Sequence, residues 1–182
     1  QKITRLKYFL KKNNLKVFIG FNLKFHQGYI KLKNVLKKNK KLGKLNYCIF
    51  KCGENLRDYH KYENYKTSYA SIKKLGGGVC LTSIHEIDMM LDLFKESSII
   101  NSHCDNISKL KINVEDFSIS TFKNTYLNNK IISIIILDFF QIISERYIKF
   151  IFENGEILLD LNNFFLFINY KNKKVKFNYK KN

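Results

Sequence analysis

Residues 75–91, LGGGVCLTSIHEIDMML, combine three glycines, two hydroxyl side chains and a histidine, and they are the stretch with the clearest chemical potential. A dinucleotide-binding fingerprint that begins at Gly76 requires a glycine at position 81, where Leu81 stands. No P-loop occurs either, because the chain's only Gly-Lys pair lacks the glycine required five residues earlier. His85 and Glu86 are adjacent and would point in different directions on a helix, which argues against a metal site. The sequence therefore predicts neither a phosphate cradle nor a metal site here.

A helix is predicted to begin near Ser83, because Ser83 and Glu86 have the spacing of a capping box. The apolar residues that follow at helical spacing are Ile84, Ile87, Leu91 and Phe94. His85 then lies in the first turn, where the helix dipole disfavours the protonated ring and keeps it ready to accept a proton. The glycines allow the backbone to pass close to a ligand or another strand. The local pattern leaves two alternatives open: a catalytic base, or a surface histidine on a capped helix.

The net charge of +18 suggests a polyanionic partner, but the composition argues against one. Alanine occurs once and proline is absent, while Lys, Asn, Ile, Phe and Tyr, the residues of A/T-rich codons, dominate. Compositional drift can produce such a charge. The lysines are spread along the whole chain, and no RNA-binding signature is present. We therefore expect no nucleic-acid partner.

The four cysteines are Cys48, Cys52, Cys80 and Cys104, and no two of them form a CxxC pair. Four residues along a strand span about 13 Å, so Cys48 and Cys52 are too far apart to share a zinc ion. Free thiols are expected. The most apolar stretch, residues 131–143, is too short to span a membrane and contains polar residues. With no visible leader, the sequence predicts a cytoplasmic protein that has no membrane contact.

The hydrophobic pattern predicts an α+β domain with a predominantly antiparallel, open sheet that carries its helices on one face. Helices are expected over residues 3–10 and 29–38, and a long loop over residues 53–70. Strands are expected over residues 15–20, around Cys48, and over 117–122, 131–140, 146–152, 157–161, 164–168 and 175–179. Asn154-Gly155 predicts a hairpin turn, and residues 131–140 predict a central strand because both of their faces are apolar.

Residues 75–91 resemble the "GGGVLLDxxHEIDxL" segment of the Gfo/Idh/MocA oxidoreductases, the family named for glucose-fructose oxidoreductase and inositol dehydrogenase. Four further segments resemble family motifs in the same order. They are residues 16–45, which begin KVFIGFNLKFH, end in LGKL and have one extra lysine around Lys40-Lys41, GENLRDYHKYENYKTSYA at 53–70, VEDFSIS at 114–120, and FENGEILLDL at 152–161 after Arg146. The resemblance covers essentially the whole chain.

The resemblance implies two domains. Residues 1–20 would be the last helix and strand of a Rossmann domain that binds NAD or NADP, and residues 21–182 would be a C-terminal domain for substrate binding and oligomerisation. The glycine fingerprint and the family's Glu-Lys-Pro motif would precede Gln1, so we expect the chain to be a piece of a longer protein and inactive alone. The open sheet face is expected to form a homo-oligomer.

The resemblance also implies roles for individual residues. His85 matches the family's general acid/base. Thr82 stands where relatives often have an aspartate that holds the substrate hydroxyl, and it can hydrogen-bond but carries no charge. Asn22 and Lys24 match a segment near cofactor and substrate, and Tyr65 and Tyr69 lie in a loop that approaches the substrate.

The predicted function is NAD(P)-dependent oxidation or reduction of a sugar or nucleotide sugar by hydride transfer, in the full-length enzyme. The alternative is a non-catalytic dimerisation or scaffold domain derived from the same family, which the Thr82 substitution motivates. The remaining histidines, His26, His60 and His103, are interpreted as structural or surface residues.

Overall fold

A computed structural model of the chain describes residues 2–38, 41–94, 96–171 and 173–180. Eight strands form one sheet in the order β2-β3-β4-β1-β5-β6-β7-β8. The strands are β1 Leu45–Asn55, β2 Ser97–Asp105, β3 Phe117–Tyr126, β4 Asn129–Asp138, β5 Phe140–Phe152, β6 Gly155–Asp160, β7 Phe165–Tyr170 and β8 Lys173–Asn178. Within the described residues β1 and β4 run parallel, and every other neighbouring pair is antiparallel. The predicted α+β class is confirmed.

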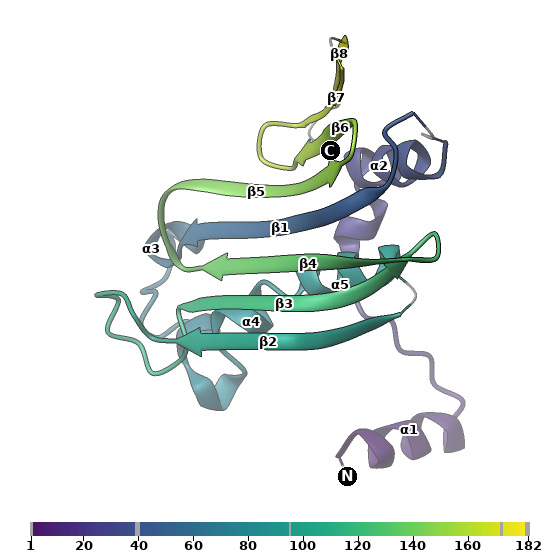
Figure 1. Cartoon of the computed structure of the whole chain (residues 1–182). Coiled ribbons are helices and arrows are strands. Elements are labelled where there is room, and N and C mark those ends of the chain that lie inside the picture. Colours follow the sequence, from purple (N-terminus) through teal and green to yellow (C-terminus); the bar gives the residue numbers. More distant parts are fainter. Residues whose placement is uncertain (1, 39–40, 95, 172, 181–182) are drawn as a thin grey trace.

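Strand β4 lies inside the sheet, between β3 and β1 (Figure 1). Ile131, Ile135 and Leu137 on one of its faces are buried, whereas Ile132 on the other is 38% exposed. This confirms the central strand that the apolar pattern of residues 131–140 predicts. The strand is shifted two residues toward the N-terminus, because the Leu127-Asn128 turn admits Asn129 and Lys130 to the ladder.

The helices that pack on the sheet cover one face of it, as the sequence predicts (Figure 1). The helices are α1 Lys2–Lys12, α2 Gln27–Lys38, α3 Leu56–Tyr59, α4 Val79–Thr82 and α5 His85–Leu93, with short 3-10 turns η1 Asn22–Phe25, η2 Tyr69–Ser71 and η3 Lys73–Leu75. The predicted helix over 29–38 is α2, which buries Tyr29, Leu32 and Leu36. Ile30 of the same helix is 46% exposed. No helix in the described part of the chain is long and apolar enough to cross a membrane.

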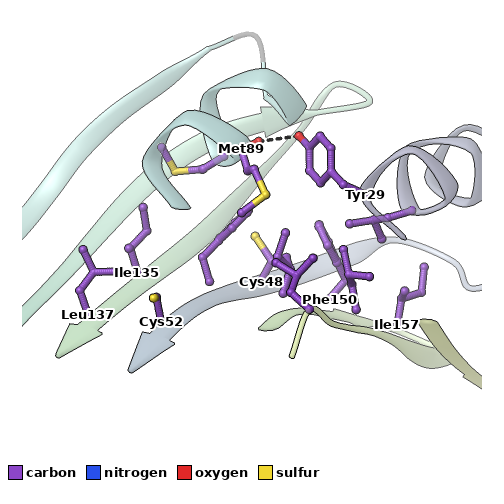
Figure 2. Packing of buried hydrophobic residues seen from close by; sticks show 14 of the residues in the cluster. Tyr29, Cys48, Cys52, Met89, Ile135, Leu137, Phe150 and Ile157 are labelled. Atoms are coloured by element: carbon purple, nitrogen blue, oxygen red, sulfur yellow. Dashed lines mark hydrogen bonds between the residues drawn. The ribbon is translucent and has the colours of Figure 1, made fainter. Parts of the chain in front are cut away.

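The core lies between this helical layer and the sheet, and Figure 2 shows its centre. Cys48 of β1, Ile135 of β4 and Phe150 of β5 point from the sheet toward Met89 of α5. Tyr29 joins the two helices: its hydroxyl has two acceptors on α5, the Met89 carbonyl oxygen at 3.0 Å and Asp92 Oδ2 at 2.9 Å. The core therefore fixes α5 to both α2 and the sheet, and α5 carries His85 at its first residue.

The opposite sheet face is covered by none of the described helices and is apolar over much of its area. Strand alternation puts Tyr47, Ile119 and Ile132 there, each 36–38% exposed. Near the middle of this face Lys51 forms a salt bridge with Asp138, and both residues are buried. An apolar surface whose buried charges are paired is suited to covering by another protein surface.

Two sheet features differ from the sequence prediction. The hairpin expected at Asn154-Gly155 is present, but its turn is Glu153-Asn154 and Gly155 begins β6. Gly155 is required there because a Cβ atom would lie 2.1 Å from the Asn169 carbonyl oxygen of β7. Strand β2 was not predicted: its sequence, SSIINSHCD, is polar, and as an edge strand it buries none of its residues.

The N-terminal segment also departs from the prediction. The helix over residues 3–10 is confirmed as α1, which has no buried residue and lies away from the sheet (Figure 1). The strand expected over residues 15–20 was wrong, because those residues form no strand and leave Val17, Phe18 and Ile19 at least 60% exposed. A strand requires a neighbour to hydrogen-bond with, and none of the described strands pairs with this segment. The assignment of residues 1–20 to a Rossmann domain stays a prediction.

Candidate functional site

The segment after the three glycines forms two short helices rather than one capped helix. Helix α4 ends at Thr82, Ser83 is its C-terminal neighbour, and α5 begins at His85. The predicted capping box was wrong: Ile84 occupies the N-cap position of α5, and no side chain caps the helix. Ser83 is already in use as the end of α4, with its backbone N–H donating to the Val79 carbonyl oxygen. His85 nevertheless lies in the first turn of a helix, as the sequence predicts.

Glu86 has a different partner from the one that the capping box assigns. It is 1% exposed, and its two carboxylate oxygens accept hydrogen bonds from Arg146 of β5, at 2.7 Å from Nε and 3.0 Å from Nη2. A buried carboxylate needs such a partner because an unpaired charge in the interior is very unfavourable. The expected apolar face of the helix changes accordingly: Leu91 is 54% exposed, whereas the buried positions of α5 are Glu86, Met89 and Met90.

His85 lies half-buried at the start of α5. Its ring packs edge-on against Phe21, with 6.1 Å between ring centroids. Its Nδ1 atom is buried and has no hydrogen-bond partner among the described residues. Burial and then the positive charge of Arg146 hold the pKa of His85 below its ordinary value of 6.5, although Glu86 and Asp88 oppose them. Burial, the main cause of this shift, therefore favours the neutral imidazole at neutral pH.

Thr82 ends α4, three residues before His85. Its Oγ1 atom is also buried without a hydrogen-bond partner in the described parts of the chain. Two orphan polar atoms so close in sequence are unusual, because buried polar side chains are normally hydrogen-bonded. Both atoms are enclosed by the protein in this structure.

Two of the three glycines before α4, Gly77 and Gly78, are explained by the protein's own packing. A Cβ atom on Gly77 would lie 2.5 Å from the carbonyl oxygen of Tyr69. Gly78 has a φ of +111°, and a Cβ atom there would lie 2.2 Å from the Glu115 carboxylate. The sequence allows the glycine backbone to pass close either to a ligand or to another part of the chain. In the structure it passes close to other parts of the chain, at Tyr69 and Glu115.

The η1 turn brings Asn22 and Lys24 to the same region. The Lys24 ammonium group forms a salt bridge of 2.8 Å with Asp88, one turn after His85 on α5. Asn22 lines a cavity of about 380 Å³ together with Arg146. The remaining residues of that cavity wall are Leu23, Phe25, His26, Leu161, Asn162 and Phe164. Asn22 thus borders a cavity that a ligand could enter, whereas the Lys24 ammonium group is already paired with Asp88.

The two predicted tyrosines have different surroundings. Tyr65 donates its hydroxyl to the Leu110 carbonyl oxygen at 3.0 Å and thereby ties its loop to the segment before β3. Tyr69 is 44% exposed and hydrogen-bonds to Tyr59. Burial raises the pKa of Tyr59, and this hydrogen bond, then the charge of Glu54, raise it further, while Arg146 lowers it. Tyr69 is therefore partly open to solvent, and Tyr65 acts as a structural contact.

Arg146, Glu86 and Glu54 are the site residues that the sequence reasoning did not assign. Burial raises the pKa of Glu54, while Arg146 lowers it. One signal was available in the sequence: Arg146 is one of three arginines, and it stands at the start of the apolar run RYIKFIF. Among the described residues, no three His, Cys, Asp or Glu side chains are grouped so that they could hold a metal ion.

No protein-family profile and no curated protein sequence matches the chain. Solved structures do match it. An inositol dehydrogenase homologue from Azotobacter vinelandii, complexed with NAD+, aligns with a TM-score of 0.74 and 13% identity, over 96% of this chain and 46% of its own. A putative NADPH-dependent oxidoreductase from Desulfitobacterium hafniense aligns with a TM-score of 0.76 and 11% identity, over 97% and 53%. The fold is that of the C-terminal domain of Gfo/Idh/MocA oxidoreductases.

A UDP-N-acetylglucosamine 3-dehydrogenase from Acidithiobacillus ferrooxidans also shares this fold, with a TM-score of 0.69, 13% identity, and coverage of 98% of this chain and 52% of its own. The chain thus spans about half the length of the structures it matches. At these identities the likeness establishes the Gfo/Idh/MocA fold, and the residue roles depend on the geometry described above.

Proposed function

We propose that the chain is the C-terminal part of an NAD(P)-dependent oxidoreductase that acts on a hydroxyl or ketone of a sugar or nucleotide sugar. One observation carries the proposal: His85 is a neutral, half-buried histidine at the start of α5, and its buried Nδ1 atom has no hydrogen-bond partner among the described residues. The fold supports it, since it is shared with an NAD+-complexed inositol dehydrogenase homologue and a nucleotide-sugar dehydrogenase.

The proposed chemistry is proton transfer by His85. When an alcohol is oxidised, its hydroxyl proton must leave, and a neutral imidazole near pH 7 is well matched to accept it. We assign this step to Nε2, because Nδ1 is enclosed by the protein. Thr82 would hydrogen-bond the same substrate region without adding charge, once its side chain turns outward, because its Oγ1 atom is enclosed in this structure. In the reverse direction the protonated ring returns the proton to the ketone oxygen.

The nicotinamide, when bound, supplies the acceptor or donor of the hydride. Of the two residues predicted to contact it, Asn22 fits better, because it lines the cavity beside Arg146 while Lys24 is held by Asp88. The rest of the cofactor site is assigned to a Rossmann domain, of which residues 1–20 would be the end. The exposed apolar side chains of Val17, Phe18 and Ile19 agree with a segment that packs against such a domain.

The test compares His85→Ala with His103→Ala in the full-length natural protein. Nicotinamide absorbance would follow turnover with a panel of sugars and nucleotide sugars. We expect His85→Ala to lower kcat by about 10²–10⁴-fold, the usual contribution of a positioned acid or base. His103 is the matched control because its side chain is 65% exposed on β2. Full turnover by folded His85→Ala would rule out the proposed role.

The alternative is a non-catalytic dimerisation or scaffold domain, which the uncharged Thr82 and the ion-paired Lys24 favour. Absence of turnover in a wild-type protein that binds no nicotinamide would support it. Either function accommodates a homo-oligomer formed through the open sheet face around Tyr47 and Ile132. We expect Ile132→Asp to shift the mass measured by light scattering to that of the monomer. The cytoplasmic location stays a prediction.

A further inference from the structure

Two free cysteines from distant parts of the sequence lie side by side outside the candidate site. Cys80 is on α4 and Cys104 is on the edge strand β2, with their Sγ atoms 3.6 Å apart. The Cys104 thiol also donates to the Ser118 hydroxyl at 3.3 Å. Cys104 is exposed and Cys80 is partly buried. The pair therefore has one thiol that solvent reaches directly and one directly behind it.

The other two cysteines have the opposite character. Cys48 and Cys52 are at most 2% exposed on β1. Cys48 lies 3.0 Å from the Ser133 hydroxyl, and burial raises the pKa of both thiols to about 12. Neither is accessible to a reagent, so they provide internal controls in the same chain.

We propose that Cys80 and Cys104 form a reversible disulfide, with a low-molecular-weight disulfide as the oxidant. The Cys104 thiolate attacks the small disulfide, forms a mixed disulfide and releases one thiolate. The Cys80 thiolate then attacks the Cys104 sulfur, forms the protein disulfide and releases the second thiolate. The two protein thiols lose two electrons and two protons, and the small disulfide is reduced to two thiols.

The geometry favours this order and requires little movement. A disulfide has its sulfur atoms about 2.05 Å apart, so the two sulfurs must approach by about 1.5 Å. We expect rotation about the Cα–Cβ bonds, with a small shift of the exposed edge strand, to bring them together. Burial raises the pKa of Cys80 to about 12, which makes the exposed Cys104 the first thiol to react.

The disulfide would restrain the movement of strand β2 relative to helix α4. Strand β2 buries none of its residues and pairs with β3 alone among the described strands. A covalent link would fasten this edge to α4, the helix that ends at Thr82 and leads into His85. Oxidation would thus restrain both the sheet edge and the segment before α5. The formation of the bond is independent of the proposed enzymatic function.

The test oxidises the full-length natural protein with glutathione disulfide, then blocks free thiols and digests with trypsin. Cleavage at lysine places Cys80 in peptide 75–95 and Cys104 in peptide 96–109. We expect these two peptides to be joined in the monomer, lighter by two hydrogen atoms than their sum, and separated again by dithiothreitol. Peptides 45–51 and 52–57, which hold Cys48 and Cys52, should carry only the blocking reagent added after unfolding. The thermal midpoint should rise by about 5–10 °C on oxidation.

Two variants complete the design. Cys80→Ser should stop the reaction at a single glutathione adduct on Cys104, whereas Ser102→Ala, which leaves both thiols in place, should still form the link. A glutathione adduct that persists on Cys104 in the wild-type protein would overturn the proposal. A Cys104–Cys104 bond between two chains, with Cys80 unmodified, would overturn it as well.

Discussion

The buried pair of Glu86 and Arg146 gives the sharpest test of how the site is held together. Glu86 is 1% exposed, the Arg146 side chain is 18% exposed, and two hydrogen bonds of 2.7 and 3.0 Å join them. Removing one partner leaves the other as an uncompensated buried charge, which costs about 3–5 kcal/mol. We therefore expect Glu86→Leu and Arg146→Met each to lower the free energy of unfolding by about that amount. For a chain of this size the thermal midpoint should fall by roughly 6–20 °C.

The double variant should be more stable than either single variant, because two apolar side chains leave no buried charge behind. Urea unfolding of the four proteins gives the coupling energy. The control is the same cycle on Lys149 and Glu156, a pair 2.9 Å apart whose side chains are 36% and 29% exposed. Its coupling should be below about 1 kcal/mol because solvent screens it. Destabilisations that simply add for Glu86 and Arg146 would show that the pair does not act as a unit, and would refute the reasoning.

Three further predictions follow from individual contacts. Gly155→Ala should lower the free energy of unfolding, measured with urea, by about 1–3 kcal/mol, because the new methyl group meets the Asn169 carbonyl oxygen. Gly20→Ala is the control: its methyl group would have no atom within 4 Å, and it should change the free energy of unfolding by less than about 0.5 kcal/mol. Tyr29→Phe should cost about 1–2 kcal/mol, since it removes the hydrogen bond to the α5 backbone. The pKa of His85 is lower in the folded protein than its ordinary value of 6.5 in the unfolded chain, so on acidification the unfolded chain binds the proton first. The contribution of neutral His85 to the free energy of unfolding is therefore present above pH 6.5 and is lost as the pH falls below that value. His85→Gln should therefore lose less stability than the wild type between about pH 7.5 and pH 5, and equal losses would contradict this.

The parts of the fold with strong apolar patterning could be predicted from the sequence. The run IISIIILDF identifies β4 as an interior strand, and Asn154-Gly155 locates the β5–β6 hairpin to within one residue. Both signals are local, because they depend on which face of the strand is buried and on which residues a turn tolerates. Strand β2 lacks such a signal. Its nine residues are held in the sheet by hydrogen bonds to β3, not by burial of apolar side chains.

The candidate site could be predicted only where its geometry is local. The placement of His85 in a first helical turn follows from the sequence around it, and the structure agrees. The role of Glu86 does not, because its partner Arg146 is 60 residues away, and nothing in a capping-box spacing indicates a buried ion pair. The same limit applies to the strand expected over residues 15–20: apolar composition favours a strand, but only a neighbouring strand can stabilise it.

The charges around His85 explain how a histidine beside two carboxylates stays neutral. Glu86 and Asp88 alone would raise the pKa of His85 by stabilising the protonated ring. Each of these carboxylates, however, has its own cation, Arg146 for Glu86 and Lys24 for Asp88. With those charges compensated, burial and the nearby guanidinium of Arg146 determine the direction, and the pKa falls. On this view Lys24 and Arg146 act on the site through their ion pairs. Arg146→Met should raise the pKa of His85 and Glu86→Gln should lower it, and histidine side-chain NMR on the folded variants would detect the two opposite shifts.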